Sequence, residues 1–156
     1  MRLLVCDDHK PLLDALSMAL TDTGHTVVAT ALDPDEAVAA ALEHQPDACL
    51  LDMNFPRASG LSAISRIRAA SADTKVVMLS GSISRDLVAD ALAEGAQGFV
   101  GKEKPLGVIV QALERAHQGH LAVDPVFMLQ ACSTRRPAGR EVARQVKKRQ
   151  VWVKRR

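Results

Sequence analysis

Five short apolar runs alternate with five longer amphipathic segments over the first 120 residues of the chain. The runs are nearly continuous in Val, Leu, Met or Ala, which is typical of strands buried on both faces of a parallel sheet. The segments between them place apolar residues at i, i+3, i+4 and i+7, the spacing of amphipathic helices. The predicted strands are Leu3–Cys6, Thr26–Thr30, Ala48–Leu51, Val76–Leu79 and Gly98–Val100, and the predicted helices are Pro11–Leu20, Pro34–His44, Gly60–Ala70, Arg85–Glu94 and Pro105–Gln118.

This alternation predicts an α/β fold, a doubly wound (βα)5 domain whose parallel five-stranded sheet carries helices on both faces. The positions of proline and glycine in the sequence agree with the proposed helix ends. Pro34 and Pro105 would each occupy a first helical position, and Gly24 and Gly95 fall just past helix ends.

The chain has 156 residues, of which 47% are apolar, so it can bury one full domain without disulfide or metal support. We expect a globular domain over residues 1–120 and a linker over 121–134, in which a short helix could begin near Asp124-Pro125. Residues 135–156 are expected to form a disordered basic tail. The formal net charge of +2 conceals this division, because residues 1–134 carry −7 and residues 135–156 carry +9.

Several classes of protein are excluded by simple features of the sequence. No apolar run approaches the ~20 residues of a transmembrane helix. The apolar stretch at the N-terminus ends in Asp7-Asp8, so it does not predict a signal peptide. Cys6, Cys49 and Cys132 are odd in number and far apart, which argues against a disulfide framework or a zinc site. We therefore expect a cytoplasmic protein without a membrane partner.

Charged and hydroxyl side chains follow four of the predicted strands. Asp7-Asp8, Asp52, Ser80 and Lys102 each come at or just after the carboxyl end of a strand. In a parallel α/β sheet these ends lie along one edge, where ligands bind. The sequence therefore predicts one site that contains three carboxylates, a hydroxyl and an ammonium group.

Three neighbouring carboxylates repel one another, and a hard divalent cation such as Mg²⁺ relieves that repulsion. A metal beside an Asp carboxylate suits phosphoryl chemistry, in which the carboxylate attacks phosphorus and a lysine pairs with a phosphate oxygen. Asp52 is the best candidate nucleophile, because Asp7 and Asp8 are adjacent and better placed to bind the metal.

These residues resemble the receiver domain of bacterial two-component response regulators. The resemblance covers residues 1 to about 120 and implies a flavodoxin-like fold with strand order 2-1-3-4-5. The pattern of glycines, Phe99 and Lys102 near its end is similar to the NarL/FixJ (LuxR-type) group. The resemblance to receiver domains is carried by four motifs: Asp7-Asp8, Asp52-Met53-Asn54-Phe55-Pro56-Arg57-Ala58-Ser59-Gly60, Val76-Val77-Met78-Leu79-Ser80-Gly81 and Gly95-Ala96-Gln97-Gly98-Phe99-Val100-Gly101-Lys102.

The resemblance implies a role for each matching residue. Asp52 would accept a phosphoryl group from a sensor histidine kinase. Asp7, Asp8, Asp52 and the backbone carbonyl of Asn54 would bind Mg²⁺. Lys102 would contact the phosphoryl group, although Lys104 remains an alternative for this role.

The resemblance also implies a switch and a partner surface. Ser80 would hydrogen-bond the phosphoryl group, and Phe99 would then turn inwards and change the face made by the fourth helix, fifth strand and fifth helix. That face would control an output, which in this group is transcriptional, and it could join two copies in a homodimer.

Relatives in this group continue into a helix-turn-helix domain of about 60 residues, and residues 135–156 are too few for a complete one. Two interpretations of this basic segment remain open: a solvated tail, or a contact with DNA through counterion release.

Two other functions compete with the signalling switch. A phosphatase of the haloacid-dehalogenase type also uses an Asp nucleophile with Mg²⁺, but it requires Asp-x-Asp where this chain has Asp52-Met53-Asn54. A degenerate receiver could serve as a protein- or nucleic-acid-binding module. The intact set of acids, together with Ser80 and Lys102, argues against this alternative. We therefore expect a phosphoacceptor that slowly dephosphorylates itself rather than an enzyme.

Overall fold

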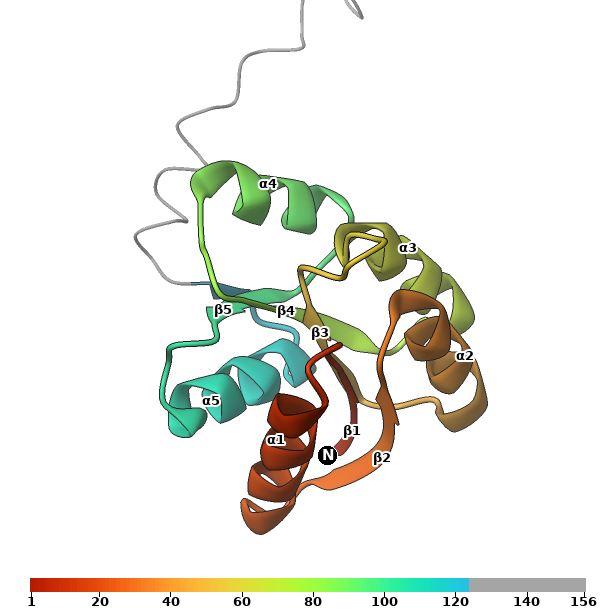
Figure 1. Ribbon diagram of the computed structural model, residues 1–156, viewed down its shortest axis with the longest axis vertical. Helices are drawn as coiled ribbons and strands as arrows, with labels where there is room; N and C mark the ends of the chain where they lie inside the picture. The colour runs from red at the N-terminus through yellow and green to blue at the C-terminus, as the bar shows by residue number, and fades with distance from the viewer. Residues whose placement is uncertain (124–156) are drawn as a thin grey trace, which may run out of the picture.

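The computed structural model describes residues 1–123, which form one parallel sheet with helices on both sides (Figure 1). The predicted linker helix near Asp124 and the basic segment 135–156 lie outside these residues. The strands are β1 (Arg2–Cys6), β2 (Thr26–Ala31), β3 (Ala48–Asp52), β4 (Lys75–Ser80), β5 (Gly98–Gly101) and β6 (Ala122–Val123), and the helices are α1 (Lys10–Asp22), α2 (Pro34–His44), α3 (Leu61–Ala70), α4 (Arg85–Ala93) and α5 (Leu106–His117).

The sheet has the order β2-β1-β3-β4-β5-β6, and all its paired strands are parallel. The predicted α/β class and the order 2-1-3-4-5 are thus confirmed. The number of strands was wrong, because a sixth strand adds to the edge of the sheet beside β5. It is only two residues long, so it produces no apolar run that a sequence pattern could detect.

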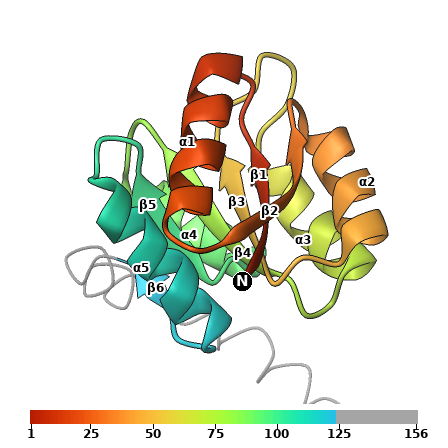
Figure 2. The same cartoon turned by 90° about the horizontal axis from the view of Figure 1, so that it is seen from below.

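Two hydrophobic cores lie on opposite faces of the sheet. Helices α2, α3 and α4 pack on one face, where Ile64 and Ile67 of α3 are fully buried. Helices α1 and α5 cover the other face, where Leu20 and Leu113 are fully buried. In Figure 1 the sheet runs between these two layers, and in Figure 2 helices α1 and α5 lie in front of it. Because both faces are covered, the central strands are apolar throughout, which explains the continuous runs in the sequence.

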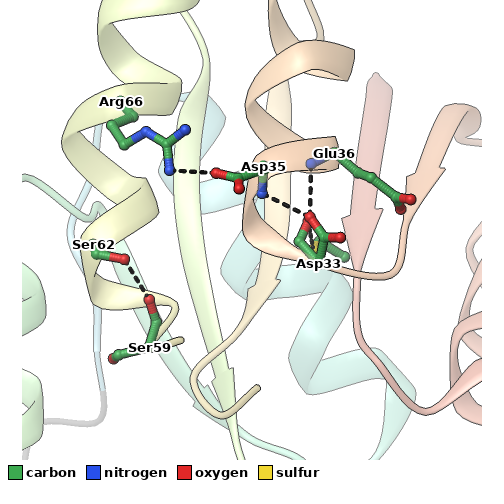
Figure 3. Close-up of polar contacts among 7 residues, drawn as sticks. Asp33, Asp35, Glu36, Ser59, Ser62 and Arg66 are labelled. Atoms are coloured by element: carbon green, nitrogen blue, oxygen red, sulfur yellow. Dashed lines mark hydrogen bonds and ion pairs between the residues drawn. The ribbon is translucent and has the colours of Figure 1, made fainter. Parts of the chain in front are cut away.

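The start of α2 follows the predicted pattern. Asp33 is the N-cap, and its Oδ1 accepts hydrogen bonds from the backbone N–H groups of Asp35 at 2.8 Å and Glu36 at 2.9 Å (Figure 3). Pro34 occupies the first turn, as expected. An ion pair of 2.7 Å between Arg66 Nη1 and Asp35 Oδ1 connects α3 to α2.

The start of α5 differs from the prediction. Pro105 is the N-cap, with an extended ψ of 147°, and the first helical residue is Leu106. An N-cap residue keeps non-helical backbone angles, and the fixed φ of proline is compatible with this position as well as with the next one.

Within residues 1–123, each helix is too short or too polar to cross a lipid bilayer.

Candidate functional site

The strand ends bring Asp7, Asp52 and Lys102 into direct contact. Cys6 pairs with Leu51 between β1 and β3, so Asp7 and Asp52 follow at the same height on adjacent strands. Lys102 follows β5, and its Nζ lies 2.6 Å from Asp7 Oδ2 and 3.0 Å from Asp52 Oδ2. One ammonium group therefore bridges two carboxylates from different strands.

The two bridged carboxylates are buried, although their lysine is partly exposed. Asp7 is 0% exposed and Asp52 is 2% exposed, whereas the Lys102 side chain is 24% exposed. Burial raises the pKa of Asp52 above its ordinary value, and the hydrogen bond and charge of Lys102 oppose this shift. Burial by itself would lower the pKa of Lys102, but the hydrogen bonds and charges of the Asp7 and Asp52 carboxylates have the larger effect. The pKa of Lys102 is therefore raised, and the amine stays protonated.

Local backbone contacts fix Asp7, while Asp8 remains at the surface. The backbone N–H of His9, the N-cap of α1, donates to Asp7 Oδ1 at 2.9 Å. The backbone N–H of Asp7 donates to the carbonyl of Ala31 at the end of β2, at 3.1 Å. Asp7 thus has one oxygen held by the backbone and the other held by Lys102, whereas Asp8 faces solvent.

The three acids lie close enough together to hold a divalent cation. Carboxylate oxygens of Asp7, Asp8 and Asp52 all lie within 4.8 Å of one another. Within the described residues, Asp52 Oδ1 is buried and has no hydrogen-bond partner. A buried carboxylate oxygen without a donor is costly unless a cation or another donor approaches it. Oxygen ligands beside solvent suit Mg²⁺, which retains several of its waters, so these residues fit that metal.

Lys102 and Lys104 have different surroundings. Lys102 contacts two of the acids, whereas Lys104 Nζ lies 3.7 Å from Glu103 Oε1 and its side chain is 41% exposed. The geometry favours Lys102 as the lysine of the site.

Ser80 lies at the same edge, with its side chain turned towards the next loop. It is fully buried at the end of β4, beside Gly101 of β5. Its hydroxyl donates to the backbone carbonyl of Ser82 at 2.6 Å, and the Ser82 N–H lies 3.3 Å from the same hydroxyl oxygen. The structure thus places Ser80 near the acids along the edge but pairs its hydroxyl with Ser82, a contact that the sequence pattern did not reveal.

Phe99 is a core residue in this structure. It pairs with Met78 of β4, is 4% exposed and packs in the core beneath α2, α3 and α4. It also lines a pocket on the side of α5.

The loop after Asp52 makes a close backbone approach at Gly60. The backbone of Asn54 pairs with that of Ser59, and the Gly60 N–H donates to the Met53 carbonyl at 2.8 Å. A Cβ atom at position 60 would lie 2.0 Å from the carbonyl oxygen of Asp52. Glycine is therefore required at position 60 by space rather than by its backbone angle, and it holds the loop against the candidate nucleophile.

Comparison with known proteins identifies close counterparts of this fold. Oxygen regulatory protein NreC from Staphylococcus epidermidis is 35% identical over 126 residues, which are 80% of this chain and 58% of NreC. The chain therefore spans less than two thirds of that relative.

Two solved structures illustrate the likeness. A two-component response regulator of the LuxR family from Aurantimonas sp. SI85-9A1 superposes with a TM-score of 0.78 at 26% identity, covering 86% of this chain and 96% of that one. A response regulator from Burkholderia pseudomallei, determined with a phosphorylated aspartic acid, a calcium ion and citrate, gives a TM-score of 0.70 at 25% identity, covering 85% and 74% of the two chains.

The family model of the response regulator receiver domain matches residues 3–114 of this chain. These residues include the three acids and the lysine of the candidate site, and they end within α5, before the sheet's last strand, β6. The chain therefore belongs to the response regulator receiver domains of two-component systems, with relatives in the NarL/LuxR-type group.

Proposed function

We propose that this chain is a phosphorylation-dependent switch that accepts a phosphoryl group on Asp52 from a sensor histidine kinase. The observation that supports this most directly is the pairing of a buried Asp52 carboxylate with Lys102, beside Asp7 and Asp8, with Asp52 Oδ1 free of a hydrogen bond from the described residues. Receiver domains in general are signalling proteins that interact with sensor histidine kinases and bind Mg²⁺ at an acidic pocket.

The proposed reaction is an in-line displacement at phosphorus. An oxygen of the Asp52 carboxylate attacks the phosphorus atom of a phosphohistidine, a P–O bond forms and the P–N bond breaks. The electron pair of that bond remains on the histidine nitrogen. Lys102 already contacts Asp52 Oδ2, and its ammonium group would move with the incoming phosphoryl oxygens and neutralise their charge.

Asp7, Asp8 and Asp52, with the backbone carbonyl of Asn54, would hold Mg²⁺. The metal would supply charge neutralisation for the incoming phosphoryl group. This chain contributes the position of the ligands: the His9 N–H orients Asp7, and the tight turn at Gly60 fixes the loop that carries Asn54.

The output of the switch would pass through Ser80 and Phe99. A phosphoryl group on Asp52 is a strong acceptor, and it would draw the Ser80 hydroxyl away from the Ser82 carbonyl. Phe99 lies on the neighbouring strand β5, so a shift of Ser80 would be passed to the surface made by α4, β5 and α5. We propose that the controlled process is transcription, in keeping with the LuxR-family relative.

Incubation of the purified chain with Mg²⁺ and acetyl phosphate tests this function. We expect an adduct of one phosphoryl group that is stable in acid, labile in base and slowly lost by autodephosphorylation. Asp52→Asn should abolish it, while Asp73→Asn, at an exposed position before β4, should leave it unchanged. A chain without an adduct, or an undiminished adduct in Asp52→Asn, would contradict the proposal. Steady multi-turnover hydrolysis would instead support a phosphatase.

A further inference from the structure

A concave surface lies between β5, β6 and α5. It encloses about 550 Å³, within the range of pockets that bind a ligand or a peptide segment. Its apolar walls include Ile83, Phe99, Val108 and Val123, and Glu103 and Arg115 are among its polar residues. None of Asp7, Asp8, Asp52 and Lys102 lines it, although Gly81 and Gly101 of its lining adjoin Ser80 and Lys102 in the chain.

The last described strand, β6, ends at this pocket. Strand β6 runs parallel to β5, with Ala122 beside Gly98 and Val123 beside Phe99. Strand β5 continues for two residues beyond this pairing, to Gly101, and Gly101 also lines the pocket. A chain that continued in the direction of β6 would therefore run along the pocket, and Val123 already forms part of its wall.

The residues that follow Val123 have the composition of a segment that needs burial. Asp124 and Pro125 come first, and Pro125 cannot donate a hydrogen bond to the edge of β5. Four consecutive apolar residues follow, Val126-Phe127-Met128-Leu129. Phe127 is four residues after Val123, a reach of roughly 13 Å in an extended chain.

We infer that Val126–Leu129 of the same chain occupies the pocket between β5, β6 and α5, with Phe127 as its main apolar contact. The pocket offers apolar walls to an apolar segment that begins at its margin, and an attached segment has a high effective concentration there. The segment would then contact Phe99 directly, which connects the chain beyond residue 123 to the core of the domain. This inference does not depend on phosphorylation of Asp52.

A disulfide cross-link in the full chain tests the position of the segment. The starting protein carries Cys132→Ser, and its remaining thiols, Cys6 and Cys49, are buried. Val108→Cys, at a 42% exposed position in the pocket wall, is combined with Phe127→Cys and oxidised. The matched control combines Leu42→Cys, a 63% exposed position on α2, with Phe127→Cys. We expect an intramolecular cross-link to form about tenfold faster in the first protein, because attachment in the pocket raises the effective concentration.

Equal rates in the two proteins would overturn the inference. A cross-link that forms only between two chains would also overturn it and would make a second copy the occupant.

A dye-binding measurement gives an independent readout that needs no cysteine at position 127. Phe127→Ser should open the pocket and increase the fluorescence of anilinonaphthalene sulfonate several-fold, while Trp152→Ser, an aromatic change elsewhere in the same terminal segment, should not. Circular dichroism would verify that both variants are folded. Equal dye fluorescence of the unmodified chain and of Phe127→Ser would show that the segment does not fill the pocket.

Discussion

Lys102 is the residue on which the electrostatics of the site depend. Its ammonium group lies within 3.0 Å of carboxylate oxygens on both Asp7 and Asp52, which are otherwise two buried negative groups on adjacent strands. The same group would face the incoming phosphoryl oxygens. It would therefore reduce the repulsion between the two carboxylates before the transfer and stabilise the negative charge that develops on the phosphoryl oxygens during it.

Replacement of Lys102 should therefore slow phosphorylation more than replacement of a neighbouring lysine. We expect Lys102→Met to reduce the rate of phosphoryl incorporation from acetyl phosphate by about 100-fold, the scale on which removal of a preorganised donor acts. Lys104→Met, which removes an exposed lysine beside Glu103, is the matched control and should change the rate by less than about twofold. Equal losses in the two variants would mean that Lys102 has no special role.

The two cysteines of the central strands provide a test of burial at single residues. Burial raises the pKa of Cys49 to about 12, and burial, followed by the charges of nearby groups, raises the pKa of Cys6. Both thiols should resist a chromogenic aromatic disulfide reagent in the native chain carrying Cys132→Ser and react at once after denaturation. Fast reaction of either thiol without denaturant would contradict the packing of β1 against β3.

The raised pKa of Cys49 makes the stability of the fold depend on pH in the alkaline range. A thiol whose pKa is raised from 9.0 to about 12 on folding keeps its proton in the folded state after the unfolded state has lost it. The contribution of this thiol to the free energy of unfolding is thus complete below about pH 9. It falls as the pH rises from there towards about 12, because the unfolded state then binds fewer protons than the folded state. Urea unfolding between about pH 8 and about pH 10 should show a smaller decline for Cys49→Ala than for the unmodified chain.

At the scale of elements, Gly60 in the loop between β3 and α3 and Gly107 in α5 differ in the space available for a side chain. A Cβ at Gly60 would meet the Asp52 carbonyl oxygen at 2.0 Å, whereas a Cβ at Gly107, in the first turn of α5, would meet no atom within 4 Å. The same chemical change should consequently have opposite effects at the two positions.

We expect Gly60→Ala to lower the free energy of unfolding by about 2 kcal/mol, since the backbone must shift to relieve the overlap. It should also slow phosphorylation, because the displaced atoms belong to Asp52. Gly107→Ala should raise the free energy of unfolding by about 0.5 kcal/mol, through the entropy that glycine loses in a helix. Urea unfolding midpoints measure both, and equal signs would contradict this account.

The sequence predicted the elements with strong periodicity and missed those defined by tertiary contacts. The five long strands and five helices follow from apolar periodicity, and Asp33-Pro34 marks the start of α2 correctly. Strand β6 was missed because two residues carry no pattern, and its pairing depends on the edge of β5. The convergence of Asp7, Asp52 and Lys102 follows from their places at the ends of parallel strands. The bond from Ser80 to Ser82 could not be predicted, because a hydroxyl rotamer depends on local geometry.

At the scale of the whole molecule, one sheet separates two cores that share no side chains. Ile64 of α3 is buried in the core on one face, and Ile109 of α5 is buried in the core on the other face. The strands between them belong to both layers, so the domain should unfold in one cooperative transition. Local packing defects on the two faces should nevertheless remain energetically independent, because the side chains do not touch.

Ile64→Val and Ile109→Val test this arrangement with identical chemistry on opposite faces. Each should reduce the free energy of unfolding by about 1 kcal/mol, the usual cost of one buried methylene. The double variant should show the sum of the two losses to within about 0.5 kcal/mol, with an unchanged dependence on urea concentration. A coupling energy above about 1 kcal/mol would mean that the sheet transmits packing changes from α3 to α5. Because the proposed switch acts through the strand ends rather than through the sheet's centre, we expect independence in the unphosphorylated chain.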